Sequence, residues 1–288
     1  MTTSTADPQT AANYLNFINY AYTMYEKHPD SLTPPTPHDF PANYKISLYL
    51  TAEDPWTLPP YKRVFYGFLA AADDPSLPDI LAVRGTEGLP EWINDFDVIP
   101  TSFTVPDSYI AGGFSNIFTS LAWRFPNGDP AELDSSLAST NAGVVFAGHS
   151  LGGAIVTMIA LNYWYFSAPS APFAIYTAAS PAVGCTVFAQ AFNELVPNSS
   201  RYINEFDGIA SALDVLYTQV NGDGIELGSV DVWPTPGCEH SLETYLWLID
   251  PAGYSLPSDC SWTASVEREN FIKVVERRRL ALSQPQPV

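Results

Sequence analysis

The run Ala142-Gly-Val-Val-Phe-Ala-Gly-His-Ser-Leu-Gly-Gly-Ala154 decides the fold of this chain. Its first part, residues 142–147, is a short continuous apolar segment, which is typical of a strand buried on both faces of a mainly parallel sheet. The stretch over 150–165 is rich in Ala, Leu and Ile and predicts a helix. A Gly-x-Ser-x-Gly pattern occurs by chance in many proteins, but between such a strand and such a helix it indicates a nucleophile elbow. The sequence therefore predicts Ser150 as a nucleophile.

The residues around Ser150 fit the steric demands of that turn. A sharp strand-to-helix turn strains the serine backbone, so the positions two residues away must lack bulk, as Gly148 and Gly152 do. The N-terminus of the following helix directs backbone N–H groups toward a carbonyl under attack. We therefore expect the N–H group of Leu151 to donate one hydrogen bond to an oxyanion.

Strand and helix patterns alternate on both sides of this run, which predicts an α/β fold with a mainly parallel sheet. The chain of 288 residues is short enough to form one domain over 1–288. Several prolines predict a wrapping loop that ends near residue 60. The tail begins near residue 252. The patterns place further strands at 63–71, 79–84, 174–178 and 201–206, and further helices at 11–27, 111–125, 187–195 and 265–282.

Composition excludes several classes of function. The formal charge of −19 disfavours nucleic acid and anionic membrane surfaces as partners. No stretch has the roughly 18 apolar residues of a membrane span, and the polar N-terminus lacks the pattern of a signal peptide. No group of His, Cys and Asp has metal-ligand spacing, so we expect neither a metal nor a cofactor.

The chain has three cysteines, which bear on its compartment. Cys238 and Cys260 are candidates for a disulfide that leaves Cys185 free. An odd count does not decide the compartment, and a secreted protein is slightly favoured over a cytoplasmic one.

The partners of Ser150 follow from chain order, because a nucleophile on such an elbow is followed first by an acid and then by a histidine. The chain has four histidines. His28 and His38 precede the serine, and His149 is its neighbour and too close to present its ring to the serine oxygen. His240 remains as the general base.

The acid is less narrowly defined. Asp207 directly follows the strand predicted at 201–206, at the carboxyl end of the sheet, where ligands collect in open α/β folds. It is therefore the first candidate, and Asp214 is the next. The other rivals are Glu205, Asp223 and Asp231.

Several blocks of the sequence occur in a recognisable order. They are Val83-Arg84-Gly85-Thr86, Glu91-Trp92-Ile93-Asn94-Asp95, Gly112-Gly113-Phe114, Phe146 to Ala154, Ala179-Ser180-Pro181-Ala182-Val183-Gly184 and Arg201 to Asp207. These blocks resemble the class 3 lipases, the filamentous-fungal type of triacylglycerol lipase, a family that includes feruloyl esterases. The resemblance covers about residues 60–210. One departure is Ala182, which stands where that family usually has arginine.

The resemblance implies an α/β-hydrolase fold and hydrolysis of acylglycerol esters through an acyl-enzyme. It implies that Thr86 is the second oxyanion donor, that Asp207 is the acid and that His240 is the base. Two alternatives stay open. One is a carboxylesterase of feruloyl type that acts on soluble esters, and the other is a non-catalytic binding protein with the same fold.

The resemblance also implies a lid at about 87–97. Leu89, Trp92, Ile93 and Phe96 fall on one helical face, so a short amphipathic helix would bury this face when closed and expose it at an oil–water interface when open. Without the family resemblance, an ordinary helix that packs in the core explains the spacing of these apolar residues equally. We thus expect a lipid or ester substrate at an interface as the partner.

Overall fold

The structure, a computed structural model, describes residues 7–54, 60–86, 96–137, 142–167, 173–222, 224–262, 268–269 and 271–275. Three of the four predicted lid residues, Leu89, Trp92 and Ile93, lie outside the described residues. The same holds for most of the predicted helix at 265–282, of which 268–269 and 271–275 are described as helical.

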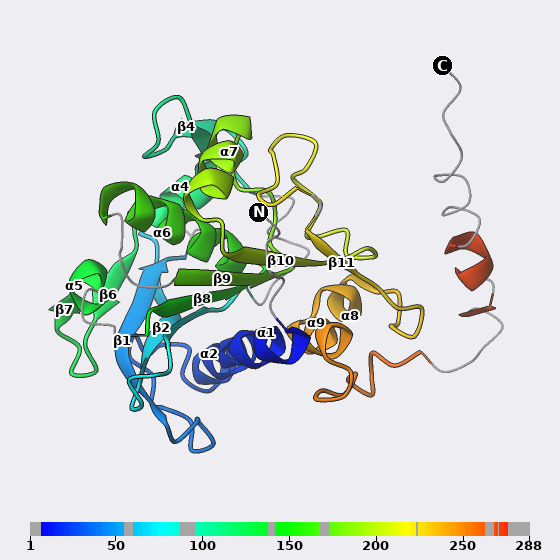
Figure 1. The fold of residues 1–288 in the computed structure, drawn as a ribbon, viewed down its shortest axis with the longest axis horizontal. Coiled ribbons are helices and arrows are strands. Elements are labelled where there is room, and N and C mark those ends of the chain that lie inside the picture. The colour runs from blue at the N-terminus through cyan, green and yellow to red at the C-terminus, as the bar shows by residue number, and fades with distance from the viewer. Residues whose placement is uncertain are drawn as a thin grey trace.

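The described strands form one nine-stranded sheet and a separate pair (Figure 1). The order across the large sheet is β11-β10-β9-β8-β3-β2-β1-β6-β7. The strands are β1 (Tyr44–Glu53), β2 (Arg63–Ala72), β3 (Asp79–Val83), β6 (Ala122–Arg124), β7 (Pro130–Ala131), β8 (Val144–His149), β9 (Phe173–Ala178), β10 (Ser199–Asn204) and β11 (Ile225–Leu227), and the pair consists of β4 (Pro100–Ser102) and β5 (Tyr109–Ala111).

The described helices cover both faces of this sheet (Figure 1). On one face lie α1 (Pro8–Leu15), α2 (Phe17–Lys27) and α9 (Leu242–Ile249). On the other lie α4 (Gly112–Thr119), α6 (Leu151–Ser167) and α7 (Thr186–Leu195). Two further short helices are α5 (Leu133–Leu137) and α8 (Pro236–His240).

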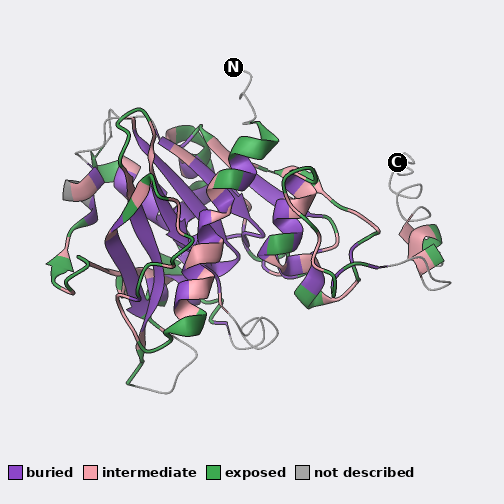
Figure 2. Ribbon diagram, turned by 90° about the horizontal axis from the view of Figure 1, so that it is seen from below, coloured by how far each residue is buried: buried purple, intermediate pink, exposed green. Residues whose placement is uncertain are grey.

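Two apolar cores result, one on each face of the sheet, and β8 contributes to both. Its side chains alternate, with Val144 and Phe146 in the core beside α6 and with Val145 and Ala147 in the core beside α1 and α2. Figure 2 shows the long central strands largely buried, whereas several helices also carry exposed residues. Burial on both faces explains why the sequence of β8 is a continuous apolar run.

The sheet is mixed. β3, β8, β9, β10 and β11 run parallel to one another. The other pairings, β3 with β2, β2 with β1, β1 with β6 and β6 with β7, are antiparallel. The predicted fold class is confirmed, and the parallel part is the half of the sheet that carries Ser150. Helix α6 connects β8 to β9, and α7 connects β9 to β10. Such crossover connections allow consecutive strands to run parallel.

Three details of the predicted secondary structure are wrong. The loop predicted up to residue 60 contains β1, whose alternating apolar residues were hidden by the prolines that precede it. The helix predicted at 11–27 is two helices that meet at Asn16. The helix predicted at 111–125 ends at Thr119, because the next residues pair with β1 as strand β6.

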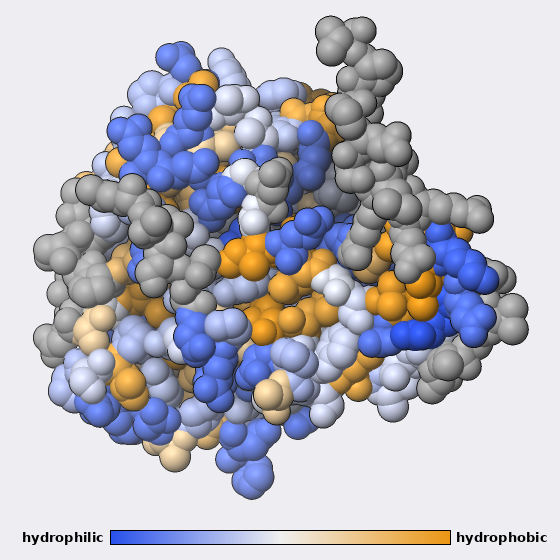
Figure 3. All heavy atoms as spheres, turned by 45° about the vertical axis from the view of Figure 1, so that its right-hand side comes forward, coloured by the Kyte–Doolittle hydropathy of each residue, from blue (hydrophilic) through white to orange (hydrophobic). Residues whose placement is uncertain are grey.

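The surface is polar over most of the face seen in Figure 3, with hydrophobic side chains gathered near its middle. Within the described part of the chain, no helix combines the length and the apolar character that a bilayer crossing requires.

Candidate active site

Ser150 sits on a strained turn between β8 and α6. Its φ of 55° lies in the left-handed region, which a residue with a side chain rarely adopts. Its N–H group donates to the carbonyl oxygen of Ala178 on β9, which holds the turn in place. A Cβ atom at Gly148 would lie 2.4 Å from the carbonyl oxygen of Gly152. Only glycine therefore fits at 148, as the elbow pattern predicts.

Ser150, His240 and Asp207 form one hydrogen-bonded chain. The Oγ atom of Ser150 lies 2.7 Å from Nε2 of His240, and Nδ1 of His240 lies 2.7 Å from Oδ2 of Asp207. All three side chains are buried. Since a carboxylate accepts only, Nδ1 of His240 carries the proton, and Nε2 is left with a lone pair for the serine hydroxyl. This is the arrangement that activates a serine toward an acyl carbon.

Asp207 is held from two further sides. Its Oδ1 atom accepts from the backbone N–H groups of Ile209 and Ala210, and its Oδ2 atom also accepts from the Tyr245 hydroxyl at 2.8 Å. Burial, followed by the charge of Asp207, raises the pKa of Tyr245 well above its ordinary value, so this hydroxyl stays protonated and donates. These donors fix the carboxylate that faces His240.

The rival acids lie elsewhere. Asp214 is exposed and accepts a hydrogen bond from Gln219. Glu205 is also exposed, and Asp231 forms an ion pair with Arg268. Asp223 lies outside the described residues. Of the described candidates, Asp207 contacts the ring of His240.

The two predicted oxyanion donors are Leu151 and Thr86. Leu151 is the first residue of α6 and directly follows Ser150. Thr86 follows Gly85, and a Cβ atom at Gly85 would lie 2.9 Å from Cβ of Ser150. The Oγ1 atom of Thr86 is buried and makes no hydrogen bond to any described group. Gly85 therefore lies against Ser150, and the oxyanion role of Thr86 stays a prediction.

Phe96 is the one predicted lid residue that the structure describes. It is buried, and its ring packs on that of Phe114 in α4 with 4.5 Å between the centroids. Position 96 therefore joins the core beside α4, whereas the other three lid residues remain a prediction.

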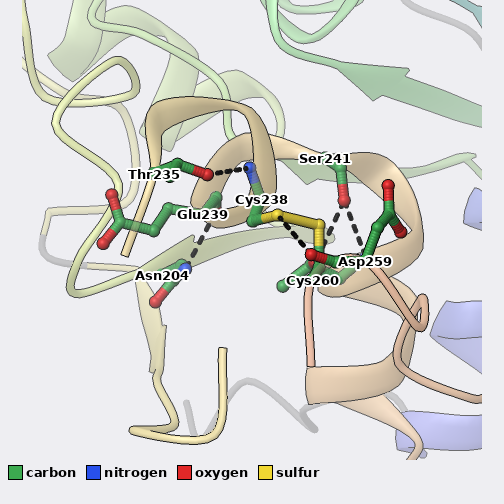
Figure 4. Close-up of a disulfide and its surroundings, with 8 residues drawn as sticks. Asn204, Thr235, Cys238, Glu239, Ser241, Asp259 and Cys260 are labelled. Carbon is green, nitrogen blue, oxygen red and sulfur yellow. Dashed lines mark hydrogen bonds between the residues drawn. A yellow bond between two sulfur atoms is a disulfide. The ribbon is translucent and has the colours of Figure 1, made fainter. Parts of the chain in front are cut away.

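A disulfide anchors the short helix that carries His240. Cys238 and Cys260 are bonded, and Cys185 is free, as the cysteine pattern suggests. Figure 4 shows this disulfide beside Glu239, whose backbone carbonyl accepts from Asn204 on β10 at 2.9 Å. The base-bearing helix α8 is thereby tied to the sheet on one side and to the tail on the other.

Glu239, next to His240, makes stability depend on pH. Burial, and then the charge of Asp207, raises its pKa to about 7. A folded-state pKa above that of the unfolded chain contributes stability that is present below about pH 4.5 and is lost as the pH rises to about 7. Replacing Glu239 by glutamine should therefore raise Tm by about 2–4 °C at pH 8 and leave it unchanged at pH 4.5.

Thermal melts at both pH values check this expectation. The matched control is Glu194→Gln, which removes the same charge from an exposed position on α7. Equal gains in Tm for the two variants at pH 8 would show that net charge, rather than the environment of Glu239, is responsible.

Among the described residues, no group of three or more His, Cys, Asp and Glu side chains is arranged to hold a metal ion. The chemistry that the described groups offer is proton transfer and nucleophilic attack.

Several residues of this site were not foreseen from the sequence. Tyr245 supports Asp207, and a chain of hydrogen bonds joins Tyr22 to His149 and His149 to the backbone of His240. A tyrosine in an apolar helix has the same sequence pattern whether it packs in a core or supports a carboxylate, so the sequence held no signal for these roles.

Residues 80–215 match the family described as lipase (class 3). A curated relative, phospholipase A1-II 3 from Oryza sativa subsp. indica, is 28% identical over 222 residues, which cover 62% of this chain and 52% of the rice protein. Its counterpart from Oryza sativa subsp. japonica is 26% identical over 222 residues. The chain thus spans about half the length of the curated relatives it matches.

Solved lipase structures share the fold. The triacylglyceride lipase of Rhizomucor miehei aligns with a TM-score of 0.57 at 21% identity, over 78% of this chain and 81% of that one. The lipase of Rhizopus microsporus var. chinensis aligns with a TM-score of 0.56 at 20% identity, over 78% and 76%. The resemblance stated from the sequence is confirmed: the chain has the α/β-hydrolase fold and is similar, over residues 80–215, to the class 3 lipases.

Proposed function

We propose that this protein is a serine carboxylic ester hydrolase of the lipase type, which cleaves acylglycerol esters through an acyl-enzyme on Ser150. The observation that carries the proposal is the hydrogen-bonded series of side chains from Ser150 through His240 to Asp207. A serine, a histidine and an aspartate in this arrangement catalyse acyl transfer without a cofactor.

The proposed reaction has two halves. The Oγ atom of Ser150 attacks the ester carbonyl carbon as Nε2 of His240 takes its proton, and the N–H groups of Thr86 and Leu151 donate to the oxyanion. The intermediate then collapses, the C–O bond of the ester breaks, and His240 returns the proton to the leaving alcohol. Water, activated by the same histidine, releases the acid from the serine.

The substrate class is tested by initial rates on p-nitrophenyl esters of increasing chain length beside emulsified triacylglycerol. A lipase should give a jump in rate above the solubility limit of the substrate and should cleave long acyl chains. A preference for short, soluble esters without that jump would favour the carboxylesterase alternative. Because the rice relatives are named phospholipase A1, emulsified phosphatidylcholine belongs in the same series.

An exposed apolar rim supports action at an oil–water interface. The residues after the predicted lid meet the segment after Asp207, since the Tyr217 hydroxyl donates to the carbonyl oxygen of Val98 at 2.6 Å. Both sides of this junction expose apolar side chains: Ile99 is 70% exposed, Val215 87% and Leu216 59%. The net charge of −19 disfavours anionic surfaces, so we expect this rim to adsorb to neutral lipid.

The double variant Val215→Ser/Leu216→Ser should lower the rate on emulsified triacylglycerol by about 30-fold, because the apolar areas of the two side chains together contribute about 2 kcal/mol to the free energy of adsorption. The rate on soluble p-nitrophenyl butyrate should stay unchanged. The measurement is the ratio of the two rates.

Tyr165→Ser/Phe166→Ser is the matched control. These residues are 42% and 71% exposed but lie at the far end of α6, about 24 Å along the helix from Ser150. An equal loss in both double variants, or a loss on the soluble ester alone, would contradict a role of the rim in adsorption.

A further inference from the structure

Helix α2, far from Ser150 in the sequence, places a hydroxyl group between two parts of the candidate site. It lies against β2, β3 and β8. The Oη atom of Tyr22 is 2.7 Å from Nδ1 of His149 and accepts a hydrogen bond from the backbone N–H group of Gly85 at 2.8 Å. Gly85 precedes the oxyanion residue Thr86, and His149 precedes Ser150.

The ring of His149 extends this connection to the general base. Its Nε2 atom lies 2.9 Å from the backbone carbonyl oxygen of His240. A carbonyl oxygen only accepts hydrogen bonds, so Nε2 of His149 carries the proton. Burial, followed by the neighbouring His240, lowers the pKa of His149 to about 3, so the ring is neutral and its Nδ1 atom accepts. The Tyr22 hydroxyl therefore donates to Nδ1.

The hydrogen bonds thus run in one direction. The N–H group of Gly85 donates to Tyr22, Tyr22 donates to His149, and His149 donates to the carbonyl of His240. The backbone N–H group of Gly85 can only donate and the carbonyl oxygen of His240 can only accept, so the neutral ring of His149 donates through Nε2 and accepts through Nδ1. These hydrogen bonds connect the backbone at Gly85, next to the predicted oxyanion donor Thr86, to the backbone of the general base His240.

A second contact from α2 acts on the same segment. Tyr25, one turn after Tyr22, stacks its ring on the guanidinium group of Arg84, with 3.5 Å from Cζ to the ring centroid. That guanidinium group donates to the carbonyl oxygen of Gly85 at 2.7 Å. Through these two tyrosines, α2 restrains Gly85 at its N–H group and at its carbonyl group.

We infer that Tyr22 is a positioning residue for catalysis, which uses His149 as a bridge to hold the oxyanion segment and His240 in register. The inference rests on the proposed function. Tyr22 makes its hydrogen bonds with protein groups, so its loss should change the transition-state geometry rather than substrate binding. A displacement of about 1 Å in such a site lowers rates by up to about 100-fold.

The test compares Tyr22→Phe with Tyr20→Phe. Tyr20 lies on the same helix, and its hydroxyl donates to a backbone carbonyl at an exposed position, Asp39, so the two variants lose the same atom. Tyr22→Phe should lower kcat on p-nitrophenyl butyrate by about tenfold or more, with KM within about twofold. Tyr20→Phe should keep the wild-type kcat. Equal kcat values for the two variants would overturn the inference.

A double-mutant cycle with His149→Gln tests the bridge. If Tyr22 acts through His149, the double variant should have a kcat no lower than that of whichever single variant has the lower kcat. Multiplicative losses would mean that the two residues act separately, which would also overturn the inference.

Nitrogen NMR of the wild-type protein provides a readout that needs no activity. The ring of His149 should be neutral with its proton on Nε2 at pH 7, and Tyr22→Phe should shift its Nδ1 resonance. A proton on Nδ1 would overturn the directional chain. The NMR measurement tests the hydrogen-bond directions separately from the proposed function. A protein that hydrolyses no ester would contradict the proposed function, even if His149 carried its proton on Nε2.

Discussion

Replacing Ser150 by alanine should abolish ester hydrolysis, with a fall in kcat on the order of 10⁵- to 10⁶-fold. The loss is this large because the serine oxygen is the atom that would bond to the acyl group, and its partner His240 has no other nucleophile within hydrogen-bond reach among the described side chains. Circular dichroism and Tm should match the wild type, since alanine accepts the same turn with a smaller side chain.

The measurement is kcat on p-nitrophenyl butyrate with purified protein. Ser115→Ala, on α4, makes the same chemical change at a residue outside the hydrogen-bonded triad and should retain the wild-type rate. A Ser150→Ala protein that kept more than about a hundredth of the wild-type kcat would contradict the assignment of the nucleophile.

Replacing Asp207 by asparagine should lower kcat by about 10⁴-fold while leaving KM nearly unchanged. The amide keeps the size of the side chain, but it offers N–H groups where the ring of His240 and the Tyr245 hydroxyl both need an acceptor. His240 would then adopt the tautomer with its proton on Nε2, and this atom could no longer accept from Ser150.

Asp214→Asn is the matched control, because Asp214 was the next candidate for the acid and is exposed. It should retain kcat within about twofold, since its partner is Gln219. A large loss at Asp214 together with a small loss at Asp207 would reverse the assignment of the acid.

The elbow and its surroundings were predictable because the constraints there are local. Ser150 lies between a buried strand and an apolar helix, and both appear in the sequence as continuous apolar runs. His240 followed from chain order and from the scarcity of histidines. Asp207 followed from its place directly after the strand predicted at 201–206, although the residues alone left its rivals open; β10 itself ends at Asn204.

The contacts that support the site could not be predicted in the same way. Tyr22 meets His149 across 127 positions of sequence, and Tyr245 meets Asp207 across 38. No periodicity encodes such distant hydrogen bonds, because each tyrosine also fits the apolar face of its helix. Strand β1 was missed for a related reason, whereas its partner β2 was predicted. β1 is a strand because it pairs with β2, and the prolines before it favour a loop.

Active-site labelling tests the central claim most directly. The intact protein is incubated with a fluorophosphonate and analysed by mass spectrometry of the whole chain and of its peptides. A catalytic Ser150 should give one adduct, on the peptide that contains this residue, and the Ser150→Ala variant should give none. An intact, folded protein that gains no adduct, or that carries the adduct on another serine, would contradict the account.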